Sequence, residues 1–380
     1  MKKVMTVFGT RPEAIKMAPL ALELAKRPEF EAICCVTAQH REMLDSVLDI
    51  FRLKPNYDLD VMEPCQTLST ITSKCLTGMD RVLEEAKPDL VLVHGDTSTT
   101  FAGALAAYYH KIPVGHVEAG LRTYDKWSPF PEEINRKLVG AIADLHFCPT
   151  PANRDNLARE NITKGVFLTG NTVIDALQTT VVKDFHFSNK VLNNLDYVNQ
   201  KVILVTCHRR ENYGQPMASI MTALRRVADA FPETELVYPV HLSPVVQEAA
   251  HQYLGGHPRI HLIDPLDVRE MHNLMARCHL VMTDSGGLQE EAPALGRPVL
   301  VLRKETERPE AVSAGTVRLA GVEEESVFQM ASQLLSNQNE YEKMAHAANP
   351  YGDGRACRRI ADAIAWHFGL RETPPDAFGG

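Results

Sequence analysis

The 380-residue sequence lacks a long hydrophobic run, a Cys-x-x-Cys pair and an excess of basic residues. Because a membrane helix needs about 20 consecutive apolar residues, no membrane span is expected. The net charge of −8 leaves no basic surplus to displace counterions from nucleic acid, so a nucleic-acid partner is not expected. The eight cysteines show no secreted-domain spacing, which predicts reduced thiols in a cytoplasmic protein.

Short apolar runs recur along the chain, and a turn and a helical stretch follow each of them. The runs do not alternate with polar residues, which indicates strands buried on both faces of a parallel sheet. The expected strands are residues 4–8, 32–38, 89–95, 113–119, 145–150, 166–170, 201–208, 235–241, 259–265, 279–285 and 298–303. The expected helices are residues 12–27, 41–51, 67–86, 97–110, 151–160, 214–230, 243–254, 286–295, 323–335, 338–348 and 355–368. This alternation predicts the α/β class.

The length and the number of strands exceed what one hydrophobic core normally holds, so two domains are expected. Residues 171–200 are polar, rich in asparagine and weakly periodic, and they separate two series of strands. We therefore expect two Rossmann-like, doubly wound domains with a cleft between them. The N-terminal domain should cover residues 1–170 and the C-terminal domain residues 171–359, with residues 360–380 packing back on the first.

An Asp-Ser-Gly-Gly run at 284–287 stands where an expected strand passes into an expected helix. Ligands of parallel sheets bind at the carboxyl ends of the strands, and glycines let an anion such as phosphate approach the helix N-terminus. Glu290 and Glu291 lie about 100° apart on that helix, so one of them is expected to meet ribose hydroxyls. With Arg308 near the next strand end, the pattern favours a diphosphate with a ribose. The alternative is a glycine turn whose acids complement the helix dipole.

Two cations lie at another turn between an expected strand and an expected helix, near the N-terminus of the chain. Arg11 and Lys16 fall at the start of an expected helix, where positive charge is unfavourable. Their placement indicates an anionic ligand. The alternative is a pair of solvated surface cations.

Two His-x-acid pairs end expected strands, His94 with Asp96 and His116 with Glu118. Residues two apart share one face of a strand, so each pair could project together. The four side chains could hold a divalent metal, as in a metal-dependent hydrolase. Alternatively, the acids transfer protons while the histidines pack and orient loops. The spacing matches no known zinc signature.

Two further stretches carry candidate groups. In SPFPEEINRK, Glu132 and Arg136 are four residues apart on an expected helix, and the simplest interpretation is a salt bridge. In TCHRREN, His208 follows the first strand of the second series, where it could bind phosphate or transfer protons near neutral pH.

A set of motifs in one order, spread between Lys3 and Arg359, carries a resemblance. FGTRPEAIKMAPL, VLVHGDTSTT, PVGHVEAGLRT, PFPEEINR, LTGNTVIDAL, CHRREN, TDSGGLQEEAPALGRPVLVLR and TERPEAV resemble the bacterial non-hydrolysing UDP-N-acetylglucosamine 2-epimerases. The resemblance implies a glycosyltransferase-B-type architecture, a homodimer and no cofactor or metal. It also implies reversible conversion of UDP-N-acetylglucosamine (UDP-GlcNAc) to UDP-N-acetylmannosamine (UDP-ManNAc), which supplies sugars for cell-surface polysaccharide.

The resemblance further implies site residues, carried over motif by motif. The substrate-binding positions are Arg11, Lys16, Asp96, Glu118, His208, Ser285, Gly286, Gly287, Glu291 and Arg308. The catalytic positions are Asp96, Glu118, Glu132 and His208, with Arg136 in support. Where relatives place a glutamine and an aromatic near the uracil, this chain has Leu266 and Met271. Where some members bind a second UDP-GlcNAc as activator, it has Gln39-His40-Arg41-Glu42 and Cys65-Gln66.

The expected chemistry follows from the sugar. The C2 hydrogen is not acidic, since no carbonyl stabilises a carbanion, so we expect loss of UDP to 2-acetamidoglucal and re-addition. Asp96 and Glu132 are assigned to protons at C2, Glu118 to the sugar and His208 to the phosphate. The competing interpretations are a retaining glycosyltransferase and a nucleotide-sugar-binding regulator without catalysis.

Overall fold

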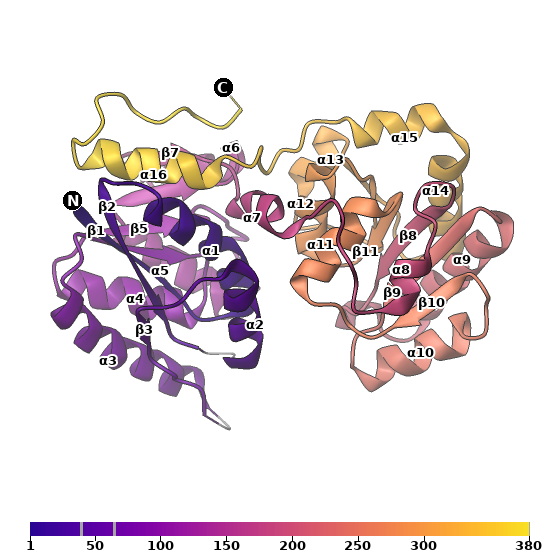
Figure 1. The fold of residues 1–380 in the computed structure, drawn as a ribbon, viewed down its shortest axis with the longest axis horizontal. Helices are drawn as coiled ribbons and strands as arrows, with labels where there is room; N and C mark the ends of the chain where they lie inside the picture. The colour runs from indigo at the N-terminus through magenta and orange to yellow at the C-terminus, as the bar shows by residue number, and fades with distance from the viewer. Residues whose placement is uncertain (39–40, 64–65, 380) are drawn as a thin grey trace. The chain divides into compact units, whose positions relative to one another are not determined.

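The computed structural model describes residues 1–38, 41–63 and 66–379, and its chain divides into two compact units (Figure 1). The first unit comprises Met1–Thr179 and Tyr351–Gly380, and the second comprises Thr180–Pro350. No helix among the described residues combines the length and the apolar character needed to cross a membrane.

The described residues of the first unit form a seven-stranded parallel sheet in the order β3-β2-β1-β4-β5-β6-β7. Its strands are β1 (Lys2–Phe8), β2 (Phe30–Val36), β3 (Tyr57–Asp58), β4 (Leu90–His94), β5 (Val114–Val117), β6 (Leu145–Cys148) and β7 (Val166–Leu168). Its helices are α1 (Arg11–Ala25), α2 (Arg41–Phe51), α3 (Leu68–Ala86), α4 (Ser98–Tyr109), α5 (Glu132–Ile142), α6 (Pro151–Arg159), α7 (Thr172–Thr180) and α16 (Ala356–His367). Helices α3, α4 and α5 pack on one face of the sheet, where their buried apolar residues meet Met5 and Val7 of β1.

The second unit has a six-stranded parallel sheet in the order β10-β9-β8-β11-β12-β13. Its strands are β8 (Lys201–Thr206), β9 (Thr234–Pro239), β10 (Ile260–Ile263), β11 (Leu280–Thr283), β12 (Val299–Val301) and β13 (Val317–Leu319). Its helices are α8 (Lys190–Asn194), η1 (Arg210–Asn212), α9 (Gln215–Ala230), α10 (Pro244–Leu254), α11 (Val268–Arg277), α12 (Gly286–Ala294), α13 (Pro309–Ala314), α14 (Glu324–Ser336) and α15 (Gln338–Ala345).

Each sheet reverses its strand order at one place. In the first unit, β2 and β3 extend the sheet on one side of β1, and β4 then pairs with the other side. In the second unit, β9 and β10 extend it on one side of β8, and β11 pairs with the other side. Such a switch point leaves space beyond the carboxyl ends of the two central strands, which is where ligands of open α/β sheets bind. The residues after β1, β4, β8 and β11 therefore line the expected ligand sites.

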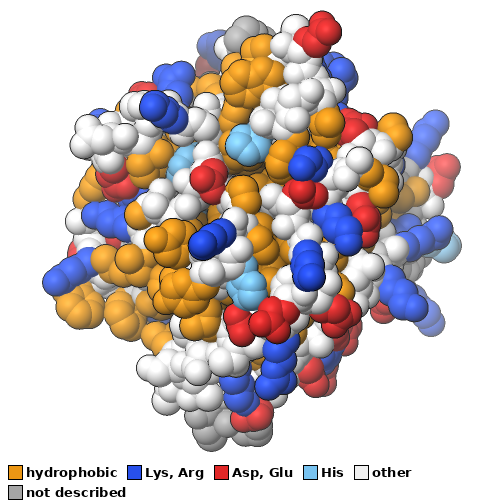
Figure 2. Space-filling model, turned by 90° about the vertical axis from the view of Figure 1, so that its left-hand side faces the viewer, with side chains coloured by type: hydrophobic (Ala, Val, Ile, Leu, Met, Phe, Trp, Pro, Cys, Tyr) orange, Lys and Arg blue, Asp and Glu red, His pale blue; other side chains and the backbone are white. Residues whose placement is uncertain are grey.

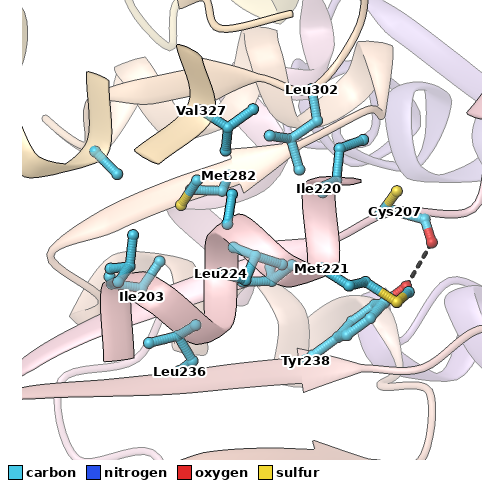
Figure 3. Close-up of a cluster of buried hydrophobic side chains, with 14 of the residues drawn as sticks. Ile203, Cys207, Ile220, Met221, Leu224, Leu236, Tyr238, Met282, Leu302 and Val327 are labelled. Atoms are coloured by element: carbon cyan, nitrogen blue, oxygen red, sulfur yellow. Dashed lines mark hydrogen bonds between the residues drawn. The ribbon is translucent and has the colours of Figure 1, made fainter. Parts of the chain in front are cut away.

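A buried hydrophobic core fixes the position of the carboxyl end of β8 (Figure 3). Leu224 of α9 and Met282 of β11 are fully buried in it, together with Ile203 of β8. Tyr238 is also buried, and its hydroxyl donates a hydrogen bond to the backbone carbonyl of Cys207. Because Cys207 directly precedes His208, core packing holds the chain at the point where the candidate site begins.

The compact units place residues 171–179 and 351–359 with the first unit, whereas the sequence predicts them in the second. The reason is a set of tertiary hydrogen bonds. Asp175 accepts from the N–H groups of Ala356 (3.1 Å) and Cys357 (2.9 Å) at the start of α16. The N–H of Asn171 donates to the carbonyl of Tyr351 at 2.6 Å. No local pattern in the sequence predicts these contacts.

Several elements are absent from the expected set. β3 has two residues and β13 three, too short for a clear apolar run. α7 contains three threonines together with a valine and an isoleucine, which have modest helix propensity, so its helix rests on tertiary contacts. α11 had a usable signal: the side chain of Asp267 accepts from the N–H of Glu270, the pattern of a helix N-cap.

Candidate active site

In the second unit, a buried carboxylate joins the ends of the two central strands. Asp284 follows β11 and is fully buried. Its Oδ2 accepts hydrogen bonds from the N–H groups of His208 and Arg209, each at 2.7 Å, and from Asn212 Nδ2 at 3.2 Å. The His208 ring stacks on the ring of His241 with 5.2 Å between centroids. The predicted His208 therefore stands at the switch point, with its side chain 36% exposed.

The N-terminus of α12 is a candidate anion site beside this carboxylate. α12 begins at Gly286, and within the described part of the chain its first turn has no side-chain cap. The N–H of Ser285 is already taken, since it donates to Thr283 Oγ1 at 2.9 Å. A Cβ placed on Gly286 would lie 3.8 Å from Arg209 Nη2 and 3.9 Å from Arg308 Nη2. Two guanidinium groups and a helix N-terminus thus converge on one glycine, an arrangement that binds phosphate.

The adjacent acids of α12 have different partners. Glu290 is buried and pairs through Oε1 with Nε of Arg308, which holds the guanidinium beside Gly286. Glu291 lies on the glycine side of the helix, with Oε1 3.4 Å from where a Cβ of Gly287 would stand. Its Oε2 is 3.3 Å from Nε2 of the buried His272. Glu290 therefore orients the Arg308 guanidinium, and Glu291 is the acid that lies on the side of Gly287.

The corresponding switch point of the first unit contains a buried acid that the sequence analysis missed. Glu13 accepts hydrogen bonds from the N–H groups of Gly9 (3.0 Å) and Thr10 (2.8 Å) and from the Thr97 hydroxyl (2.6 Å). Burial raises the pKa of the Glu13 carboxyl, and these donors oppose the shift. The capping box of Thr10 and Glu13 was a readable signal for it. Arg11 is half-buried and makes no hydrogen bond or ion pair with any described residue, so its guanidinium is available to an anion.

Glu118 is held in an unusual backbone conformation at the end of β5. Its φ is +62°, a left-handed value that costs a residue with a Cβ about 1 kcal/mol. Its carboxylate pairs with the ammonium of Lys16 and accepts from Asn171 Nδ2 at 3.0 Å. His94 Nε2 lies 3.7 Å from the other carboxylate oxygen. The predicted Lys16 and Glu118 thus form one cluster, in which Asn171 is a member that the sequence analysis did not single out.

The two histidines of the His-x-acid pairs are buried and neutral. Burial lowers the pKa of His94 to about 4, and the Glu118 carboxylate only partly opposes this. Burial lowers the pKa of His116 to about 3, although its Nε2 shares a hydrogen bond with the Gly95 carbonyl at 2.7 Å. The strands end before the acids, so the expected strand-face pairing is wrong. Over the described residues, no group of three or more His, Cys, Asp or Glu side chains is placed to hold a metal.

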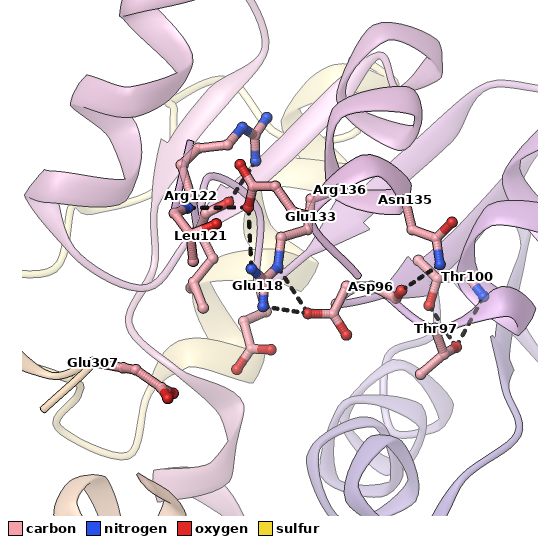
Figure 4. Close-up of polar contacts among 12 residues, drawn as sticks. Asp96, Thr97, Thr100, Glu118, Leu121, Arg122, Glu133, Asn135, Arg136 and Glu307 are labelled. Atoms are coloured by element: carbon pink, nitrogen blue, oxygen red, sulfur yellow. Dashed lines mark hydrogen bonds and ion pairs between the residues drawn. The ribbon is translucent and has the colours of Figure 1, made fainter. Parts of the chain in front are cut away.

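Arg136 bonds to Asp96 rather than to Glu132 (Figure 4). Its Nε and Nη2 lie 2.8 Å and 2.6 Å from Asp96 Oδ2, and its Nη1 lies 3.3 Å from the fully buried Glu133. Asn135 Nδ2 donates to the Asp96 backbone carbonyl at 2.8 Å. The expected salt bridge four residues apart is therefore wrong, because the sheet brings Asp96 to Arg136 from 40 positions away. Glu132 is half-buried and has no hydrogen bond or ion pair within the described chain.

The structure divides the predicted site residues between the units. The first unit carries Arg11, Lys16, Asp96, Glu118, Glu132 and Arg136, and the second carries His208, Ser285, Gly286, Gly287, Glu291 and Arg308. In the segment proposed for the base, Leu266 is buried and Met271 half-buried. Of the stretches expected at an activator site, Gln39, His40 and Cys65 lie outside the described residues.

Comparison with known proteins identifies the family and the fold. The family model described as UDP-N-acetylglucosamine 2-epimerase matches residues 22–365. The chain belongs to the UDP-N-acetylglucosamine 2-epimerase family. The family's enzyme from Bacillus subtilis (strain 168) is 58% identical over 379 residues, which cover 100% of this chain and 99% of that protein. The enzyme of Escherichia coli (strain K12) is 53% identical over 368 residues, covering 95% and 98%.

Solved structures of the 2-epimerase family agree with this fold. A putative UDP-N-acetylglucosamine 2-epimerase from Listeria monocytogenes superposes with a TM-score of 0.93 at 53% identity, over 98% of both chains. The UDP-GlcNAc 2-epimerase from Neisseria meningitidis, solved with UDP-GlcNAc bound, gives 0.85 at 48% identity, over 96% of this chain and 100% of that one. The predicted family, the α/β fold of glycosyltransferase-B type and the enzymatic function as a UDP-GlcNAc 2-epimerase are confirmed.

Proposed function

We propose that this epimerase interconverts UDP-GlcNAc and UDP-ManNAc by eliminating UDP to 2-acetamidoglucal and adding it back, without a cofactor. We further propose that it supplies ManNAc-derived sugars for cell-surface polysaccharide. The convergence of Arg209 and Arg308 on Gly286 carries the mechanistic proposal. A leaving diphosphate needs this kind of preorganised positive charge.

In this proposal the second unit binds the nucleotide. The β-phosphate lies against the N–H groups of Gly286 and Gly287, where the α12 dipole and the two guanidinium groups stabilise its negative charge. Glu291 accepts hydrogen bonds from the ribose hydroxyls. A UDP-GlcNAc 2-epimerase of Neisseria meningitidis binds UDP-GlcNAc, and a Staphylococcus aureus relative was solved with UDP, which supports this choice of ligand.

The reaction balances without a redox step. The C1–O bond breaks and its electron pair stays on the β-phosphate oxygen, while a carboxylate removes the C2 proton and the C1–C2 double bond forms. Return of the proton to the opposite face of C2, with attack of UDP at C1, gives the epimer. Each well-placed donor to the departing oxygen contributes about 3 kcal/mol to lowering the barrier.

The first unit supplies the acids. Arg136 binds Oδ2 of Asp96 and fixes its orientation, which suits a carboxylate that must meet one face of C2. Glu132 has no protein partner among the described residues, so it can exchange a proton with the substrate at little structural cost. Glu118, with Lys16 and Asn171 bound to its carboxylate, positions the sugar.

The decisive experiment is proton NMR of UDP-GlcNAc incubated with the protein in D2O. Elimination predicts that the C2 proton signal disappears from both epimers, because the removed proton exchanges with solvent. Asp96→Asn should slow this exchange by about 10²-fold or more. The matched control is Asp89→Asn: Asp89 binds the N–H of Lys3 at the amino end of the sheet, far from the strand ends that carry the site.

Two outcomes would contradict the proposal. Formation of UDP-ManNAc with full retention of the C2 proton would exclude proton exchange at that carbon. A stoichiometric, tightly held NAD in the purified protein would assign the inversion to hydride transfer.

We also propose that the enzyme is a cytoplasmic homodimer. The cysteines within the described residues are buried and unpaired, which fits a reducing compartment. A hollow of about 530 Å³ at the amino ends of the first unit's strands is lined by Tyr108, Tyr109, Ile112 and Ile142 among others. The two tyrosines are 61% and 63% exposed, and Figure 2 shows hydrophobic side chains gathered on the face that it views. An exposed apolar patch of this kind favours a second copy of the chain as its partner.

Light scattering coupled to gel filtration tests the dimer. The wild type should have twice the chain mass of 42.3 kDa, and a Tyr108→Glu/Tyr109→Glu double variant should have the mass of one chain. A monomeric wild type would exclude this interface.

A further inference from the structure

The buried Asp284 has more binding capacity than its structural contacts use. Its Oδ2 accepts three hydrogen bonds that hold the turn after β8. Its Oδ1 is buried and accepts no hydrogen bond from any described residue. A buried oxygen left without a donor is costly, by about 1–3 kcal/mol.

The His208 ring faces this oxygen. The buried Cys207 thiol also lies beside the Asp284 carboxylate: burial raises the pKa of that thiol, and the carboxylate raises it further. Nδ1 of His208 lies 3.5 Å from Asp284 Oδ1, slightly beyond hydrogen-bond distance. The ring cannot turn freely, because it is stacked on His241 with the two planes 9° apart. A small shift of the ring within its plane closes the gap. A carboxylate can only accept, so the contact requires the proton of the imidazole to be on Nδ1.

We propose that Asp284 is a positioning residue that holds His208 with Nδ1–H directed at Oδ1, so that Nε2 meets the bound diphosphate and gains a proton from solvent when it binds. This inference rests on the proposed UDP site. Asp284 directly precedes Ser285 and Gly286. The residue that orients the imidazole is therefore next to the N-terminus of α12, where the phosphate is proposed to bind.

The charges around His208 are consistent with uptake of a proton when the ligand binds. Burial lowers the pKa of the imidazole most strongly, Asp284 raises it, and His241 and Arg209 lower it. The ring is therefore mainly neutral before the ligand binds. A diphosphate adds negative charge beside Nε2, while Asp284 supports the resulting positive charge from the other side of the ring. The imidazolium then stabilises the charge that develops on UDP as it leaves.

The first test needs no turnover. Long-range ¹H–¹⁵N NMR, with His208→Gln to assign the signals, reports which ring nitrogen carries the proton. The wild type should show Nδ1–H. In Asp284→Asn the new amide can donate to Nδ1, so the proton should move to Nε2. A wild-type ring protonated on Nε2 would overturn the inference, whether or not the variant folds.

The second test is proton linkage to UDP binding, measured by titration calorimetry in buffers of different ionisation enthalpy near neutral pH. The wild type should take up about one proton per UDP, and Asp284→Asn close to none. The matched control is Asp175→Asn, since Asp175 is also a buried acid that accepts from two backbone N–H groups, but at the start of α16. This control should lower the thermal midpoint and leave proton uptake unchanged.

Activity distinguishes a failure of the proposed function from a failure of the role of Asp284. Asp284→Asn should lower kcat by about 10²-fold or more and flatten the alkaline limb of its pH profile, where His208 would lose its proton. If the wild type neither binds UDP nor epimerises its sugar, the proposed function fails. If it does both, and Asp284→Asn keeps the wild-type tautomer and proton uptake, only the role of Asp284 fails.

Discussion

Gly286→Ala should weaken the binding of UDP without weakening the fold. A Cβ at this position meets nothing closer than 3.8 Å, so the methyl group fits the unliganded protein. The residue begins α12 and does not have a positive φ, so alanine is compatible with its backbone. Replacing such a glycine removes conformational freedom from the unfolded chain and stabilises by about 0.4–1 kcal/mol. The thermal midpoint should therefore stay constant or rise slightly.

The same methyl group occupies the space between the two guanidinium groups, where the proposal places a phosphate oxygen. Displacing that oxygen removes at least one charge-assisted hydrogen bond, worth about 1.5–3 kcal/mol. The dissociation constant for UDP should therefore increase about 10- to 150-fold.

Calorimetric titration with UDP and thermal melting with and without UDP measure both quantities on one sample. The variant should have an unchanged or higher thermal midpoint than the wild type, and it should bind UDP more weakly. A Gly286→Ala variant that binds UDP as tightly as the wild type would refute the placement of phosphate at α12. A variant that loses stability and affinity together would show that the loss of binding came from misfolding.

Three further predictions concern the first unit. Glu132→Gln should change the free energy of unfolding by less than about 0.5 kcal/mol and slow epimerisation by about 10²-fold or more, as measured by urea melts and steady-state rates; equal turnover would remove Glu132 from the mechanism. Arg136→Met should lower kcat by about 10²-fold with a smaller change in KM, because Asp96 loses its orienting partner; an effect confined to KM would instead assign Arg136 to substrate binding. The buried His94 and His116 have pKa values of about 4 and 3 in the fold, against 6.5 ordinarily. As the pH falls, the unfolded chain therefore protonates these histidines before the folded chain does. The free energy of unfolding, which is constant with respect to these groups above about pH 6.5, should decrease by on the order of 1 kcal/mol per histidine near pH 5.5. Urea midpoints of the wild type and a His94→Gln variant check this, and an equal pH slope in both would contradict it for His94.

The elements that could be predicted from sequence are those whose signal is local. Runs such as VMTVF and DLVLVHG are apolar without alternation because both faces of each parallel strand are buried under helices. Helix starts with a cap or an early proline, such as Thr10-Arg11-Pro12, were placed to within a residue or two. The short strands β3 and β13 and the threonine-rich helix α7 were not predicted, because their formation depends on contacts with neighbouring elements.

The amino-acid sequence by itself determined the strand–helix alternation, the positions of the glycines and acids after the strands, and the family to which their order belongs. The tertiary structure decided the partners: Asp96 for Arg136, Glu290 for Arg308 and Asp284 for His208. These pairs join residues that are far apart in the chain. His208 and Asp284 meet because β8 and β11 are neighbouring strands, whereas Arg136 and Arg308 reach their acids because a helix or a loop folds back over a strand end. Local propensity does not encode which strands become neighbours, so the pairing of charges at the site could be seen only in the folded molecule.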